Sequence, residues 1–260
     1  MKANILFARI ELVRPLSSYL IMNQLSGWKP LEKPGKVTES RLIRAILDGT
    51  FEINSSLPGE RALADMLGVT RPTLREALQR LERDGWLEIR HGKPTRVRDF
   101  WKEGKLGVSI ALAEYQQPAL EDFTANLLEV RVLLAPAYTS SAVENAPAEI
   151  ADYLQESRIP GLNGTPEAYA KYDWGLHWLL TVHSGNPFFT HFINSVEQLY
   201  EILGKKYYQF SQTRDHSRKF YKDLRKCASN QQPEEAGRLA VGVMNESCEL
   251  WKKLVAKVNG

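Results

Sequence analysis

The sequence predicts a mainly α-helical protein in two parts: an N-terminal winged helix-turn-helix, with three helices and a β-hairpin wing, followed by an all-α antiparallel helical bundle. Between residues 57 and 97, two short helical patterns flank a tight turn and precede two short alternating segments. From about Leu106 onward, every periodic segment repeats at helical spacing. The chain has 260 residues, which exceeds one typical domain, so two domains are expected.

Two helices joined by a tight turn form the centre of the first part. The run Pro58-Gly59-Glu60 is typical of a helix start, and Gly68 of a helix end. Thr70 is a good N-cap for the second helix. Such a second helix can enter the major groove of DNA with its first residues near the base edges. The apolar residues that repeat at helical spacing are Ala62, Leu63, Met66 and Leu67, then Leu74, Ala77, Leu78 and Leu81.

The predicted wing follows directly. Residues 86–90 alternate like a half-buried strand, 91–94 form a turn, and 95–98 form the return strand. Residues 60–98 hold nine basic and six acidic side chains, and the arginines gather at the start of the second helix and in the wing. A plain helical pair with solvated charges is the alternative, and the wing argues against it.

The remaining N-terminal segments complete this domain. Residues 1–35 are expected to be a leader. Thr38 is expected to cap a helix that carries Leu42, Ile43, Ile46 and Leu47. The winged domain is therefore placed at 36–98, and a linker at 99–105. Phe100 and Trp101 are adjacent aromatics in that linker, so we expect it to be docked rather than free.

Composition limits the class of protein. Hydrophobic residues make up 43%, charged residues 25%, and the formal net charge is +3, so nucleic-acid binding has to come from local clustering. No stretch reaches about 18 uninterrupted apolar residues, which argues against a membrane span. Cys227 and Cys248 lie in helical patterns without metal-ligand spacing, as expected in a reducing cytoplasm.

The bundle, placed at 106–260, has helical segments at about 106–116, 119–144, 148–157, 166–184, 187–210, 215–229 and 233–257. Bundles of this kind can enclose a ligand cavity. Asp173 and His177 share a helical face at the spacing of a metal-ligand pair. No nucleophile–base grouping or phosphate-binding glycine loop is present, so no catalytic residue is assigned. Aromatic residues that by periodicity favour a core role are Tyr200, Tyr207, Tyr208, Phe220, Tyr221 and Trp251.

The run P-x-E-R-x-L-A-x-x-L-G-V-T-R-x-T-L-R-E-A-L resembles the winged helix of the GntR family of bacterial regulators. The wing H-G-K-P-T, followed by Phe100-Trp101, resembles the fatty-acid-metabolism regulators of that family. The resemblance covers nearly everything after about Lys36, and it implies that Met22 could be the true start. Pro72 stands where the best-known member has a hydroxyl residue. The implied DNA-binding residues are Arg61, Thr70, Arg71, Thr73, Arg75, His91, Gly92 and Lys93.

Further segments resemble the effector domain of these regulators, among them Ser184-Gly185-Asn186-Pro187 and Glu246-Ser247. That domain binds long-chain fatty acyl-CoA, and His177 stands where the best-known member has an aromatic residue. Apolar walls suit an acyl chain, while an arginine and hydroxyls can satisfy its polar groups. The implied effector-binding residues are Leu128, Arg131, His177, Tyr200, Tyr207, Tyr221, Ser247 and Trp251.

The resemblance implies a cytoplasmic, homodimeric transcription factor that binds double-stranded operator DNA and uses no cofactor. Long-chain acyl-CoA would act as an allosteric effector and release the DNA. The implied targets are fatty-acid degradation genes, which it would repress, and unsaturated-fatty-acid synthesis genes, which it would activate.

Two alternatives remain open. In many relatives an Asp-x-x-x-His helix binds a metal with two later histidines, and the protein could then respond to an organic acid. Tyr221 and Asn245 stand at those later positions here, so that ligand set is incomplete. The other alternative is an acyl-CoA-processing enzyme that carries a DNA-binding domain.

Overall fold

Three helices and a short hairpin form the N-terminal unit of the computed structural model, which describes residues 33–90, 92–116 and 120–259. Strands β1 and β2 are antiparallel, with Leu87 opposite Val97 and Glu88 opposite Arg96. This is the predicted winged helix-turn-helix. Its elements are α2 (Pro34–Leu47), α3 (Glu60–Leu67), α4 (Arg71–Asp84), β1 (Leu87–Glu88) and β2 (Arg96–Val97).

Local signals explain where α3 and α4 begin and end. Gly68 has φ 67° and Gly85 has φ 94°, left-handed values that glycine adopts without strain. Thr70 caps α4, since its hydroxyl accepts a hydrogen bond from the Thr73 amide at 3.3 Å. On α3, Leu63 is buried, whereas Ala62 and Met66 face solvent and Met66 is 69% exposed. The apolar repeat of α3 therefore overstates its buried face.

The first helix begins earlier than the sequence suggests. Thr38 does not cap it, because α2 already starts at Pro34. Thr38 is buried in the second turn, and its hydroxyl donates to the Pro34 carbonyl at 2.7 Å. Proline at the first helical position replaces the expected hydroxyl cap.

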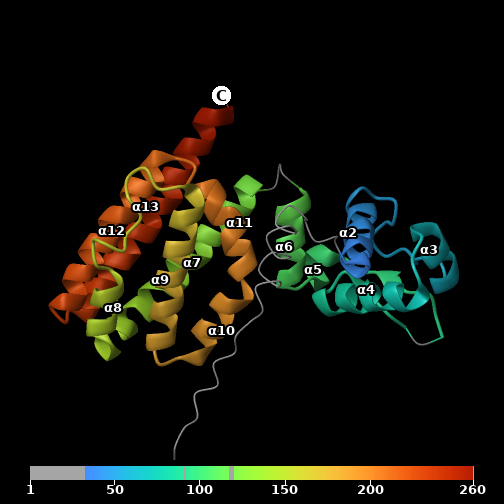
Figure 1. Cartoon of the computed structure of the whole chain (residues 1–260), viewed down its shortest axis with the longest axis horizontal. Coiled ribbons are helices and arrows are strands. Elements are labelled where there is room, and N and C mark those ends of the chain that lie inside the picture. The colour runs from blue at the N-terminus through green and yellow to red at the C-terminus, as the bar shows by residue number, and fades with distance from the viewer. Residues whose placement is uncertain (1–32, 91, 117–119, 260) are drawn as a thin grey trace, which may run out of the picture.

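The C-terminal part is a bundle of helices, which lies at the other end of the molecule from α2, α3 and α4 (Figure 1). The long helices α7 and α13 pack along each other, α9 packs on α7 and α11, and α12 packs on α8 and α13. The predicted helical bundle is confirmed. Its helices are α7 (Leu120–Asn145), α8 (Pro147–Tyr153), α9 (Pro166–His183), α10 (Pro187–Ser195), α11 (Glu197–Tyr207), α12 (Ser211–Ser229) and α13 (Pro233–Asn259).

One predicted helix is in fact two. The periodic segment 187–210 breaks at Val196, which has φ −106° and ψ 7° and separates α10 from α11. The Ser195 hydroxyl donates to the Phe192 carbonyl at 2.7 Å just before the break. Neither glycine nor proline marks this position, so the sequence carries no breaker signal there.

The connection between the two parts is helical and docked. It comprises α5 (Phe100–Glu103) and α6 (Leu106–Tyr115). Phe100 is buried, with its ring 4.8 Å from that of Trp86, as expected for a docked linker. Trp101 is 61% exposed, so the expectation of docking is wrong for that residue.

Helix α6 belongs to two apolar cores. Val108, Ala111 and Leu112 pack in the same buried cluster as Trp86 of the winged domain. Ala113, on α6 as well, packs with Leu199 and Leu203 of α11. Helix α6 thus physically joins the DNA-binding unit to the bundle.

Candidate DNA-binding face and buried polar site

The exposed arginines of α3 and α4 form the candidate DNA-binding face. Arg61 lies in the first turn of α3, and Arg71 and Arg75 lie in the first two turns of α4; all three are exposed. The Arg75 Nε atom lies 2.7 Å from the Glu60 carboxylate. Arginines at the start of a recognition helix can reach guanine edges or phosphates.

The threonines of this face shape the start of the recognition helix. The hydroxyls of Thr70 and Thr73 lie 2.9 Å apart, and the Thr70 hydroxyl also caps the helix. Both hydroxyls therefore already have a partner within the protein. Their first role is to fix the backbone from which Arg71 projects.

The wing tip carries small and basic residues. Gly92 has φ 70° and an added Cβ would meet no atom within 4 Å, so its backbone is open to an approaching duplex. Lys93 is exposed beside it. His91 lies outside the described residues.

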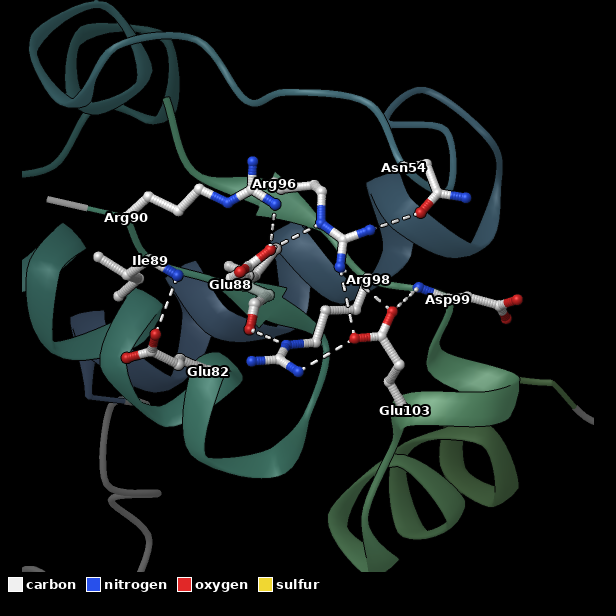
Figure 2. A network of polar contacts seen from close by, with 10 residues as sticks. Asn54, Glu82, Glu88, Ile89, Arg90, Arg96, Arg98, Asp99 and Glu103 are labelled. Atoms are coloured by element: carbon white, nitrogen blue, oxygen red, sulfur yellow. Dashed lines mark hydrogen bonds and ion pairs between the residues drawn. The ribbon is translucent and has the colours of Figure 1, made fainter. Parts of the chain in front are cut away.

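The base of the wing is held by an ion-pair network, drawn in Figure 2. Glu88 pairs with Arg90 at 2.5 Å and with Arg96 at 2.8 Å. Bonds from Arg90 and Arg96 lower the pKa of the Glu88 carboxyl to about 2. Glu103 of α5 pairs with Arg96 at 3.2 Å and with Arg98 at 3.1 Å.

Because of this network, some of the basic side chains counted in residues 60–98 are neutralised within the protein. Arg96 and Arg98 are turned toward carboxylates, and Arg96 also donates to Asn54 at 2.7 Å. They fix the wing to α5 instead of adding free positive charge to the wing tip. The sequence count of basic residues could not reveal these partners.

The second site is a polar cluster inside the bundle, centred on Asp173. One carboxylate oxygen accepts from the Tyr221 hydroxyl at 2.8 Å, and the other accepts from the Tyr200 hydroxyl and from Arg131 at 3.3 Å. Burial alone would raise the pKa of Asp173, but the charge of Arg131 and the tyrosine hydroxyls outweigh it and lower that pKa. An ionised carboxylate is thus held in the core by a buried cation.

His177 completes this cluster in its neutral form. Burial, and then the charge of Arg131, lower the pKa of His177 to about 3. The Arg131 Nη2 atom lies 2.5 Å from His177 Nε2. Because arginine can only donate, Nε2 accepts and Nδ1 carries the proton, which it donates to the Tyr138 hydroxyl at 2.8 Å.

The interactions of Asp173 and His177 are relevant to the metal alternative. Both carboxylate oxygens and both ring nitrogens are already engaged by Arg131 or tyrosine hydroxyls. In the described part of the chain, no group of three or more histidine, cysteine or acidic residues could hold a metal ion. This geometry favours a polar core cluster over a metal centre.

The other effector-binding candidates lie next to the cluster. Leu128, Tyr207 and Trp251 are buried together, and the Trp251 indole donates to the Glu121 carbonyl at 3.1 Å. The Ser247 hydroxyl donates to the Val243 carbonyl at 2.9 Å. The bundle thus brings all eight candidate side chains into or beside one buried region.

Two poorly satisfied donors stand out there. Arg131 Nε is buried without a hydrogen-bond partner. The buried Tyr207 hydroxyl makes no hydrogen bond of good geometry, but the Ser247 hydroxyl is close enough to offset part of the rise in the Tyr207 pKa that burial causes. Both residues line a cavity of about 20 Å³, whose walls include Leu127, Leu128 and Leu203. A second cavity of about 20 Å³ lies between α7 and α10, and it too is lined by Arg131 and Tyr200.

Sequence reasoning missed Tyr138 and identified Tyr208 only as a core aromatic. Tyr138 bonds His177, and the Tyr208 hydroxyl contacts Ser217 at 3.1 Å and Tyr221 at 3.4 Å. Tyr138 follows Arg131 by seven positions, so the two share a face of α7, and that spacing was an available signal.

Comparisons with known proteins agree with this architecture. Residues 35–97 match the family model of the bacterial regulatory proteins, gntR family, and residues 98–260 match the FadR C-terminal domain. The fatty acid metabolism regulator protein of Shewanella amazonensis is 36% identical over 221 residues, which cover 85% of this chain and 91% of the relative. That of Shewanella pealeana is 35% identical over 221 residues, or 85% of this chain and 92% of the relative.

A solved structure supports the fold. Lar, which controls the expression of the Listeria monocytogenes agr system, aligns with 88% of this chain and 100% of its own, at a TM-score of 0.56 and 18% identity. Across the described ranges, no helix is long and apolar enough to span a membrane. The relatives are regulators, which excludes the enzyme alternative. The chain therefore belongs to the GntR family of bacterial regulatory proteins, in the group with a FadR C-terminal domain, and is a DNA-binding transcription factor of fatty acid metabolism.

Proposed function

We propose that a long-chain acyl-CoA enters the bundle beside Arg131 and Tyr207 and thereby releases the protein from operator DNA. The unpaired Nε atom of Arg131, which shares a small cavity with the Tyr207 side chain, is the observation that carries the proposal. Buried donors without partners are rare in folded proteins and need an explanation. A thioester carbonyl would accept hydrogen bonds from both, while Leu127, Leu128 and Leu203 would contact the acyl chain.

Ligand entry requires the bundle to open. Ligand pockets usually measure about 300–1,000 Å³, whereas the two cavities beside Arg131 measure about 20 Å³ each. An acyl chain would therefore have to separate α11 from α7. Residues Tyr200 and Tyr207 of α11 face this region, while Leu199 and Leu203 of the same helix pack in the cluster that includes Ala113 of α6.

A displacement of α11 would in this way move α6 and the attached winged domain. In a homodimer bound to a near-palindromic operator, the two winged helices must keep one spacing, so moving them weakens binding to both half-sites. The coupling is reciprocal, and DNA should weaken acyl-CoA binding by the same factor. We further propose that the protein acts in the cytoplasm, represses fatty-acid degradation genes and activates unsaturated-fatty-acid synthesis genes.

The test is release of a fluorescent duplex, selected from a random library by the wild-type protein, at fixed salt because phosphate contacts make affinity salt-dependent. Oleoyl-CoA should release the duplex, whereas CoA alone and oleate alone should not. If oleoyl-CoA, CoA and oleate all fail to release the duplex, the effector assignment is refuted.

Tyr207→Phe sharpens this test, because it deletes a hydroxyl with only a weak contact to the Ser247 side chain and leaves the ring in place. We expect it to keep DNA binding and to raise the half-releasing oleoyl-CoA concentration about fivefold, equivalent to one hydrogen bond of roughly 1 kcal/mol. Tyr153→Phe is the matched control, since the Tyr153 hydroxyl donates to the Tyr172 carbonyl at 2.9 Å, away from this cavity.

A further inference from the structure

The arginines of the DNA-binding face differ in how they are held. The Nε atom of Arg75 lies 2.7 Å from the Glu60 carboxylate. Among the described residues, no carboxylate lies within ion-pair distance of Arg61 or Arg71. Of these three arginines, and within the described residues, only Arg75 has its side-chain direction set by a carboxylate of a second helix.

Stability does not explain this ion pair. The side chains of Arg75 and Glu60 are 57% and 37% exposed, and pairs this open contribute little to folding. Glu60 is the first residue of α3, where the helix N-terminus favours a negative charge. That position nevertheless puts a carboxylate on a surface that has to approach phosphates, which reduces overall affinity for DNA.

The geometry of the pair suggests a benefit that offsets this loss of DNA affinity. Glu60 engages the Nε side of the guanidinium, and no intramolecular hydrogen bond from Nη1 or Nη2 of Arg75 occurs in the described part of the chain. Those two terminal nitrogens form the fork that matches O6 and N7 of guanine. When Glu60 fixes the direction of the Arg75 guanidinium, the side chain loses less conformational freedom on binding DNA. It is also less free to turn to a nearby phosphate.

We propose that Glu60 is a positioning residue that aims Arg75 at a base edge, and that it raises sequence specificity at the expense of overall DNA affinity. This inference rests on the proposed function as an operator-binding protein and on the DNA-binding role that the resemblance implies for Arg75, and it is independent of the acyl-CoA effector. Glu60 acts through Arg75 and is not itself required to touch DNA.

The test measures two affinities for each variant by anisotropy at fixed salt. One duplex of about 20 bp, enough for two half-sites, is selected from a random library by the wild-type protein, and the other has the same composition in scrambled order. In Glu60→Ala we expect the ratio of the two affinities to fall about tenfold, as for a weakened bidentate base contact, while scrambled-duplex affinity rises. The lost discrimination should map to the same base pair in each half-site that Arg75→Ala relaxes.

Asp65→Ala is the matched control, since it removes an exposed carboxylate from the same helix. It should raise both affinities together and leave their ratio within about twofold, as expected when only charge repulsion is removed. Thermal melting of each variant distinguishes a folding defect, which would lower both affinities in parallel.

Two outcomes overturn the proposal. One is that Glu60→Ala and Asp65→Ala have the same ratio of selected-duplex affinity to scrambled-duplex affinity. The other is a loss of discrimination at base pairs that Arg75→Ala leaves unaffected. If the wild-type protein enriches no sequence at all, base reading by this face is refuted and the proposal with it. If oleoyl-CoA fails to release the selected duplex, only the effector proposal is refuted. The affinity ratios of Glu60→Ala and Asp65→Ala still test the role of Glu60.

Discussion

Replacing Asp173 by asparagine should strongly destabilise the bundle, because it leaves the charge of Arg131 without its counter-ion. The Arg131 side chain is only 13% exposed and that of Asp173 only 2%. Removing one partner of a buried ion pair costs about 3–5 kcal/mol, which is a large share of a typical stability of about 5–15 kcal/mol. Asparagine keeps one acceptor oxygen for one of the Tyr200 and Tyr221 hydroxyls, and its NH2 group can donate to the other hydroxyl once that turns, so the deficit comes mainly from Arg131.

A double-mutant cycle isolates that contribution. Arg131→Met should also destabilise the protein, but Arg131→Met combined with Asp173→Asn should be more stable than the sum of the two effects by about 2 kcal/mol, because no unpaired charge remains. Urea unfolding of the four proteins at pH 7 measures this, with the dependence on urea concentration as a check on the unfolding model. Additivity within about 0.5 kcal/mol would refute the ion-pair account.

Two further predictions concern a backbone position and a titrating group. Gly85→Ala should cost more stability than Gly49→Ala. Both glycines have positive φ, which costs other residues about 1–3 kcal/mol of strain. An added Cβ at Gly85 lies 2.8 Å from the Glu103 carbonyl oxygen, whereas an added Cβ at Gly49 meets nothing within 4 Å. Equal losses of urea stability would contradict this contact. His177, with a folded pKa of about 3, contributes stability that is present above its unfolded pKa of roughly 6.5 and falls by about 1.4 kcal/mol per pH unit below it. His177→Gln should remove that slope between pH 6 and 5, while the exposed control His191→Gln should keep it.

The sequence predicts best where the structure depends on local signals. Helix α4 begins at the Thr70 cap that the sequence predicts, and it ends at Gly85, a glycine in the left-handed conformation. Periodicity likewise identifies most of the bundle helices. It fails at Val196, where a helix ends without glycine or proline, and at Thr38, where an earlier proline already starts the helix.

Long-range pairings were beyond sequence reasoning for a physical reason. Composition shows that arginines and glutamates are present, but not that Glu103 of α5 neutralises Arg96 and Arg98 at the base of the wing. The polar cluster shows the same limit: Asp173 and His177 share a helical face, and only the packing of α7 against α9 brings Arg131 and Tyr138 to them. A spacing that suggested a metal pair is thus occupied by core hydrogen bonds.

The same packing determines which route a signal from the bundle can take. The ion-pair network ties the wing to α5, and the Lys105 amide donates to the Asp84 carbonyl at 3.0 Å, which ties the start of α6 to the end of the recognition helix. Because Val108 and Leu112 are buried in the core of the winged domain, α6 cannot shift alone without leaving a cavity there. In the proposed homodimer, a displaced α11 would therefore carry α6, α4 and the wing together, which would change the spacing of the two winged domains and leave the geometry of each intact.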